Sequence, residues 1–94
     1  MKPIPHPHPH VRVLVAEGRV VVEVDGYELF DWVDDHLTEQ CSLISEYHLP
    51  PKNAGEPWRL YFNPEVEAQE MVERLLELDA SEVERVHALS RFEK

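Results

Sequence analysis

The chain has 94 residues, a formal net charge of −10 at pH 7 and 43% hydrophobic residues, which allows one small domain with a modest core. The negative charge argues against binding to nucleic acids or anionic membranes, because phosphate contacts need a surplus of Lys and Arg. The single Cys41 excludes an internal disulfide and does not indicate an oxidising compartment. We find no apolar run typical of a signal peptide or a membrane span, so we expect a cytoplasmic protein.

Proline and histidine alternate near the N-terminus, over residues 5–10. Proline at every second position fits an edge strand whose outer side offers no N–H groups for pairing. The same composition fits a polyproline-II tail, and this is the favoured interpretation of residues 1–7. We therefore predict a tail or an edge-strand extension over residues 1–9, followed by a single domain over residues 10–94.

Two β-branched runs, residues 11–16 and 20–24, predict a β-hairpin. A two-residue turn at Glu17-Gly18 would gather six valines on one face of the hairpin. It would also place Arg12 opposite Glu23 on the other face, where opposite charges stabilise a strand pair. A three-residue loop would place charged residues opposite valines, so the pattern favours the two-residue turn.

An apolar stripe at i, i+4 spacing predicts a helix from about residue 28 to about residue 42. Its inward side consists of Leu29, Val33, Leu37, Cys41 and Ile44. Acidic residues on its outward side form what we call the first acidic patch: Asp31, Asp34, Asp35 and Glu39.

Proline and glycine in residues 49–57 predict a loop, and a short strand around residues 43–47 is an open alternative before it. Alternating apolar side chains then predict a strand over residues 58–62. Its apolar face would present Trp58, Leu60 and Phe62.

Asn63, Pro64 and Glu65 predict the start of a helix that ends near residue 78, because Asn favours the N-cap and Pro the first helical position. We expect its inward side to consist of Ala68, Met71, Val72, Leu75 and Leu78. The acids on its outward side form the second acidic patch: Glu67, Glu70, Glu73 and Glu77.

A last helix begins either with the capping box Ser81–Glu84 or with the similar pattern Asp79–Glu82. We expect it to bury Val83, Val86 and Leu89. The complete order is β-β-α-β-α-α. It predicts an α+β fold in which a small antiparallel sheet opens with a β-hairpin and the helices pack on one face.

Metal binding through the N-terminal segment is one functional hypothesis. Imidazole nitrogens at alternate positions of an extended chain point the same way and can bind zinc or nickel. The candidate ligands are His6, His8 and His10. They would form an open site without a fourth ligand nearby.

Catalytic patterns are missing from the sequence, and we therefore predict that the protein is not an enzyme. Cys41 lies on an apolar stripe without a base to activate it, which is typical of an inert buried thiol. The separated histidines fit positions in or beside the core; they are His36, His48 and His87.

The two acidic patches support the leading hypothesis, a small acidic binding protein that recognises a basic protein surface. Inhibitors, immunity proteins, antitoxins and nucleic-acid mimics are often small and acidic in the same way. This is a comparison with classes of protein, and no sequence motif supports it. A solvated surface that keeps the protein soluble explains the acids as well. However, a surface shaped by stability alone would mix the signs of charge more evenly, whereas complementary fields speed association with a basic partner. Aromatic anchors for such a partner are Trp32, Tyr47, Trp58 and Tyr61.

A structural domain that forms homodimers is the third alternative. It would leave an apolar face uncovered, either on the strand at 58–62 or on the last helix.

Overall fold

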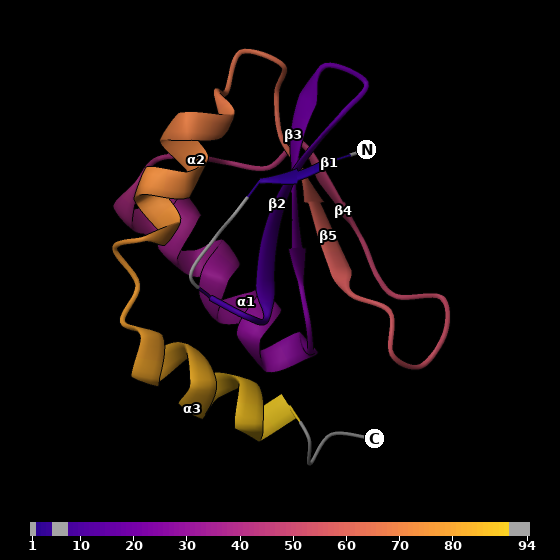
Figure 1. Cartoon of the computed structure of the whole chain (residues 1–94), viewed down its shortest axis with the longest axis vertical. Helices are drawn as coiled ribbons and strands as arrows, with labels where there is room; N and C mark the ends of the chain where they lie inside the picture. Colours follow the sequence, from indigo (N-terminus) through magenta and orange to yellow (C-terminus); the bar gives the residue numbers. More distant parts are fainter. Residues whose placement is uncertain (1, 5–7, 91–94) are drawn as a thin grey trace.

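The computed structural model describes residues 2–4 and 8–90. In this part of the chain the elements are β1 (Lys2–Ile4), β2 (Val11–Ala16), β3 (Arg19–Val24), α1 (Tyr27–Asp35), the π-helix η1 (His36–Gln40), β4 (Tyr47–Leu49), β5 (Trp58–Tyr61), α2 (Ala68–Leu75) and α3 (Ala80–Ser90). The strands form one antiparallel sheet in the order β1-β2-β3-β5-β4. The helices lie on one side of this sheet (Figure 1). The predicted α+β fold is therefore confirmed.

The β2–β3 hairpin has the predicted register. Arg12 pairs with Glu23, and the two-residue turn consists of Glu17 and Gly18. Both turn residues have positive φ, 54° and 79°, as a type I′ turn requires. Five of the six valines on the helix-facing side are buried, but Val15 at the end of β2 is 43% exposed, because no helix reaches that corner of the sheet.

Two short strands extend the sheet at its edges. Residues 2–4 form the edge strand β1, which pairs with β2. These three residues are therefore not the polyproline-II tail that the sequence favoured, and the edge-strand alternative fits them better; residues 5–7 lie outside the described part of the chain. At the opposite edge β4 spans Tyr47–Leu49, later than the strand considered around residues 43–47. Its pairing with β5 shortens the predicted loop to residues 50–57.

Two helices pack directly on the sheet, and the third packs mainly on another helix. The first helix lies across β3 and β5, and α3 packs mainly on α1, whereas α2 packs on β2. Amphipathic periodicity explains this arrangement, since each helix buries one stripe. The fully buried residues from these elements include Leu29, Val33, Leu37, Leu60, Phe62, Met71 and Leu75. None of the helices in residues 8–90 is long and apolar enough to cross a lipid bilayer.

The first helix does not continue to residue 42 in α-helical form. Its last turn is the π-helix η1, and Ser42 then adopts a positive φ of 57°. The amide of Leu43 donates to the carbonyl of Leu37, six residues earlier, at 2.7 Å; this bond spans one residue more than the 6→1 bond of a Schellman end. Leu43 consequently enters the core, while Ile44, which we expected on the buried stripe, is 68% exposed.

The second long helix begins at Ala68, not at Pro64. The Asn63 side chain accepts from the amide of Glu65 at 2.8 Å, but it stabilises an isolated turn because Glu67 is extended (φ −89°, ψ 142°). The local capping pattern is therefore present one turn before the helix.

The last helix begins after Asp79, whose carboxylate accepts from the amides of Ser81 at 2.8 Å and Glu82 at 3.2 Å. Of the two predicted starts, the structure has the earlier one. Val83 and Val86 are buried as expected, but Leu89 is half exposed, because it lies beyond the end of the core.

Candidate functional site

The two acidic patches lie on the solvent side of the helical layer. In the first patch Asp31, Asp35 and Glu39 are exposed and Asp34 is half-buried, and all four residues of the second patch are exposed. The amphipathic pattern explains this position, because the opposite stripes of the same helices form the core.

Ion pairs are scarce in both patches. Within residues 8–90, Glu77 is the one member of the eight with an ion pair: its Oε2 accepts from Arg74 Nη1 at 2.8 Å, and its Oε1 lies 3.6 Å from His36 Nε2. Arg74 thus pairs with Glu77 at i+3 and not with Glu70, one turn earlier on the helix. The charge of the patches is therefore largely uncompensated.

Acidic residues on the open face of the sheet are, by contrast, neutralised. Glu23 accepts from Arg12 Nε at 3.2 Å and from Arg59 Nε at 2.9 Å. Asp25 accepts from both terminal nitrogens of Arg12, at 3.2 and 2.8 Å. The hydrogen bond with Asp25, together with that from Glu23, raises the pKa of Arg12 above its usual value.

Two further arginines are used in the same way. Arg19 on the hairpin pairs with Glu46 at 2.9 Å, and Arg85 on α3 pairs with Glu82 at 2.6 Å. The described arginines therefore serve mainly to neutralise acids outside the two patches.

Crowding of like charges is visible at Asp34. Partial burial is the largest cause that raises its pKa, and the neighbouring carboxylate of Asp35 raises it further, with a smaller contribution from Asp31. Both causes disfavour the charged form. The first patch is thus a region of concentrated negative potential.

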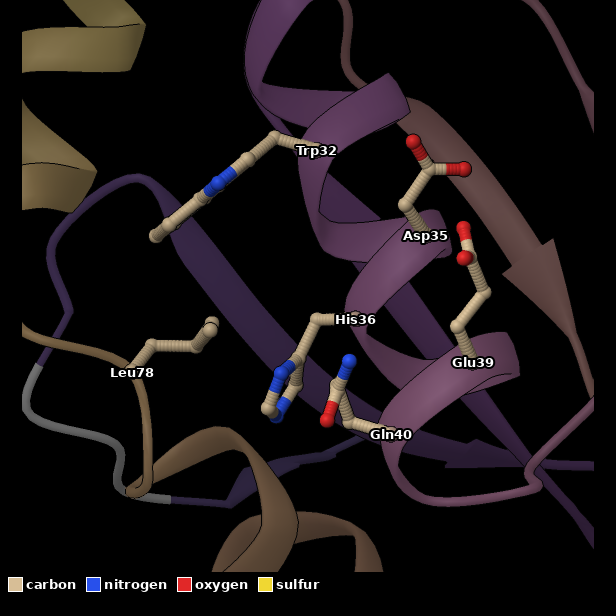
Figure 2. A pocket seen from close by; sticks show the side chains of 6 residues that line it. All are labelled: Trp32, Asp35, His36, Glu39, Gln40 and Leu78. Atoms are coloured by element: carbon tan, nitrogen blue, oxygen red, sulfur yellow. The ribbon is translucent and has the colours of Figure 1, made fainter.

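A pocket of about 220 Å³ opens beside the first patch, between the α1–η1 helix and the segment that joins α2 to α3. Trp32 and His36 point toward Leu78 across the pocket, whereas the carboxylates of Asp35 and Glu39 lie together on the other side of the helix (Figure 2). The lining thus offers an aromatic ring on one side of the helix and two carboxylates on the other, and both kinds of group suit cationic side chains.

The other predicted anchors lie elsewhere. Tyr47 and Tyr61 stack at 4.6 Å on the open face of the sheet, where they help to line a second hollow of about 520 Å³. Trp58 is half-buried and stacks on Phe30 at 4.5 Å. Of the four anchors, Trp32 is the one that lines the pocket of the first patch.

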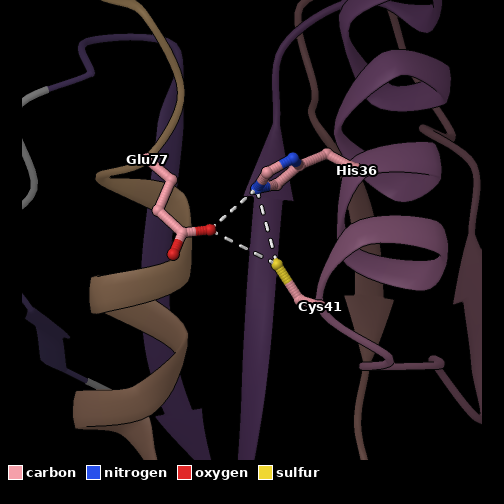
Figure 3. Close-up of side chains that lie close together, drawn as sticks. All are labelled: His36, Cys41 and Glu77. Carbon is pink, nitrogen blue, oxygen red and sulfur yellow. Dashed lines mark hydrogen bonds and ion pairs between the residues drawn. The ribbon is translucent and has the colours of Figure 1, made fainter.

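Three potential metal ligands meet where η1 approaches the end of α2. His36 Nε2 lies 3.5 Å from Cys41 Sγ and 3.6 Å from Glu77 Oε1, and Cys41 Sγ lies 3.7 Å from the same oxygen. Figure 3 shows the three side chains converging, His36 and Cys41 from η1 and its end and Glu77 from the turn that follows α2. His36 is also one wall of the pocket beside the first patch.

The π-helix explains why His36 and Cys41 are neighbours. Residues five apart are about 140° apart around an α-helix, whereas the i→i+5 hydrogen bonds of a π-helix bring them nearly above one another. Sequence reasoning missed this group because it placed both residues on an ordinary α-helix.

Cys41 is half-buried, less than the sequence suggested. Desolvation is the largest cause that raises its pKa, followed by the charge of Glu77 and the hydrogen bond that the thiol donates to it. A raised pKa keeps the sulfur protonated at neutral pH, so the expectation of an unactivated thiol agrees with its surroundings.

The N-terminal histidines have separate surroundings. His8 is 3% exposed, and its Nε2 lies 3.1 Å from the carbonyl of Leu75. His10 stacks on His87 at 3.5 Å, and its Nε2 lies 3.3 Å from a Glu84 oxygen. His6 lies outside the described residues. A shared metal site of His6, His8 and His10 therefore stays a prediction.

No protein-family model matches this chain, and no similar curated protein or solved structure was found.

Proposed function

We propose that this chain is a small, non-enzymatic binding protein that docks a basic protein surface onto its two acidic patches. The observation that supports this proposal is the unequal use of charge. Arginines neutralise Glu23, Asp25, Glu46 and Glu82. By contrast, seven of the eight patch acids have no ion pair within residues 8–90.

The unpaired acids of the helical layer produce a negative electrostatic potential in the surrounding solvent. Such a field raises the rate of encounter with an oppositely charged partner and disfavours acidic competitors. It also costs stability, because like charges one helical turn apart repel. A function in recognition would explain why the protein keeps these mutually repelling charges.

The pocket beside the first patch is the proposed central contact. A lysine or arginine of the partner would contact the ring of Trp32, and neighbouring basic residues would contact the carboxylates of Asp35 and Glu39. Cation–π contact and charge-assisted hydrogen bonds favour arginine over lysine at such a site. The partner surface would thus present an arginine surrounded by further basic residues.

The first step of the test captures the partner from lysate of the source cells at low and at high salt. The purified partner is then measured for association rate across a salt series. The variants are Asp35→Lys/Glu39→Lys in the first patch and Glu70→Lys/Glu73→Lys in the second. The matched control is Glu17→Lys/Glu65→Lys, which changes the net charge equally at two exposed positions outside both patches.

We expect a patch variant to slow association by about tenfold at low salt and to flatten its salt dependence. The control should have a much smaller effect. Equal slowing by patch and control variants would mean that net charge alone matters, and an unchanged rate in both patch variants would exclude docking at these faces.

A further inference from the structure

We propose that His36, Cys41 and Glu77 form a binding site for Zn²⁺ at the junction of η1 and the end of α2. This proposal does not rest on the recognition function proposed above, although Glu77 belongs to the second acidic patch and His36 lines the pocket beside the first. The site also differs from the N-terminal histidines.

The spacing of the three donor atoms is that of ligands around one tetrahedral ion. Two ligands of such an ion are about 1.6 bond lengths apart, so bonds of about 2.0–2.3 Å separate donor atoms by roughly 3.3–3.7 Å. The observed separations are 3.5, 3.6 and 3.7 Å. An ion inside this triangle would reach all three donors without movement of either helix.

The Cys41 thiol is within hydrogen-bond distance of both of its neighbours in the triangle, but the contact between His36 and Glu77 is not explained by a direct hydrogen bond. The distance between His36 Nε2 and Glu77 Oε1 is 3.6 Å, longer than the 2.7–3.2 Å typical of an N–H···O bond. The imidazole nitrogen instead lies 3.2 Å from the carbonyl of Arg74. This contact orients the ring toward the α2 side of the cluster.

The surroundings also orient the carboxylate. Arg74 Nη1 donates to Glu77 Oε2 at 2.8 Å, leaving Oε1 directed at the sulfur and the imidazole (Figure 3). Outer-shell contacts of this kind hold ligands in place and contribute to metal affinity. Glu70 adds a further negative charge that acts on Cys41.

The donor set indicates the metal. One imidazole, one thiolate and one carboxylate suit Zn²⁺, which accepts mixed N, S and O ligands with tetrahedral geometry. On binding, the Cys41 thiol proton leaves to solvent, and the His36 proton moves from Nε2, where it is donated to the Arg74 carbonyl, to Nδ1, so the metal bond replaces that hydrogen bond. Three protein ligands leave the fourth position to water.

Cobalt(II) provides a specific probe, because it replaces Zn²⁺ in tetrahedral sites and gives a near-ultraviolet charge-transfer band with thiolate. Cys41 is the single cysteine of the chain, so this band reports one site even if the histidines near the N-terminus also bind metal. The full chain, reduced with a phosphine, is titrated with Co²⁺ and then with Zn²⁺.

The test variants are Cys41→Ser, His36→Gln and Glu77→Gln, and the matched controls are Glu73→Gln on α2 and His48→Gln on β4. Circular dichroism of each variant checks the fold. Glu77 is well exposed, with 44% of its side chain accessible, so Glu77→Gln should fold even if His36→Gln does not.

We expect one equivalent of Co²⁺ to produce the band, Zn²⁺ to abolish it, and Cys41→Ser to lack it. His36→Gln and Glu77→Gln should weaken binding by about tenfold or more, since loss of even an outer-shell partner has that effect. The controls should bind like the natural chain. A missing band in the natural chain, or a folded Glu77→Gln that binds Co²⁺ as tightly as Glu73→Gln, would overturn the proposal.

Discussion

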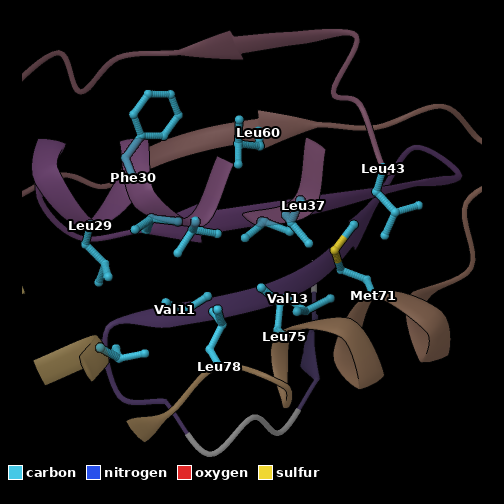
Figure 4. Packing of buried hydrophobic residues seen from close by; sticks show 14 of the residues in the cluster. Val11, Val13, Leu29, Phe30, Leu37, Leu43, Leu60, Met71, Leu75 and Leu78 are labelled. Atoms are coloured by element: carbon cyan, nitrogen blue, oxygen red, sulfur yellow. The ribbon is translucent and has the colours of Figure 1, made fainter. Parts of the chain in front are cut away.

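The open face of the sheet and the helical layer handle charge in opposite ways. On the sheet, Glu23 lies between Arg12 and Arg59, and Asp25 adds a second partner for Arg12. On the helices, two acidic patches face solvent almost without bases. Both regions are built on the same apolar core (Figure 4), so packing does not explain the difference. Paired charges stabilise the sheet, whereas the unpaired ones of the helical layer are the charges that, in the proposed function, attract a basic partner.

The largest effect is expected where a paired acid is removed from the sheet. Glu23→Gln should lower the free energy of unfolding by about 1–3 kcal/mol, because it weakens charge-assisted bonds to two half-buried arginines. Glu23 itself is 14% exposed, so water replaces those bonds poorly. Urea unfolding measures the change, with Glu67→Gln in the second patch as the control. A loss below about 0.5 kcal/mol, the level typical of surface substitutions, would contradict this difference between the two regions.

A smaller effect of opposite sign is expected on α2. Glu73→Gln should raise stability by about 0.2–0.5 kcal/mol, because Glu73 and Glu77 are like charges at i, i+4. Gln retains an oxygen for the bond that Gln69 donates to Glu73 at 3.1 Å. Thermal unfolding at low and high salt measures the gain, which should shrink as salt screens the repulsion. Destabilisation at low salt would show that this acid has a stabilising role.

An effect of similar size is expected at Asp34, in the first acidic patch. Asp34→Asn should stabilise the fold at neutral pH by about 0.3 kcal/mol after allowance for solvent screening. The charges that act on Asp34 are Asp35, Asp31 and His48, while Thr38 hydrogen-bonds to it.

The pH dependence of this gain has a defined sign. The folded-state pKa of Asp34 lies above the ordinary 3.8, so the protonated form favours folding below that ordinary value and this contribution is lost as the pH rises through the folded-state pKa. The advantage of Asp34→Asn should therefore exist at neutral pH and fade in acid. Unfolding curves of both proteins across the acid range measure it, and an advantage that grows as the pH falls would reverse the sign.

Local patterns predicted much of the fold. The hairpin register followed from the alternation of valines and from Arg12 facing Glu23, because a one-residue slip would turn every side chain to the wrong face. The outward position of both acidic patches followed from helical periodicity in the same way. The errors concern the ends of elements: Ile44 was expected to be buried but is exposed, and α2 begins at Ala68 instead of Pro64. At such positions small differences in local hydrogen bonding decide where a helix begins or ends.

The sequence alone determined an α+β domain, a hairpin in one register and two acidic helix surfaces, because these depend on periodicity within short segments. Only the tertiary structure decided which acids find arginines, since Glu23 and Arg59 are 36 residues apart. It also decided that His36, Cys41 and Glu77 meet. That meeting requires a π-turn in place of an α-turn and the close approach of a second helix, and both depend on packing across the core, which a pattern of neighbouring residues does not encode.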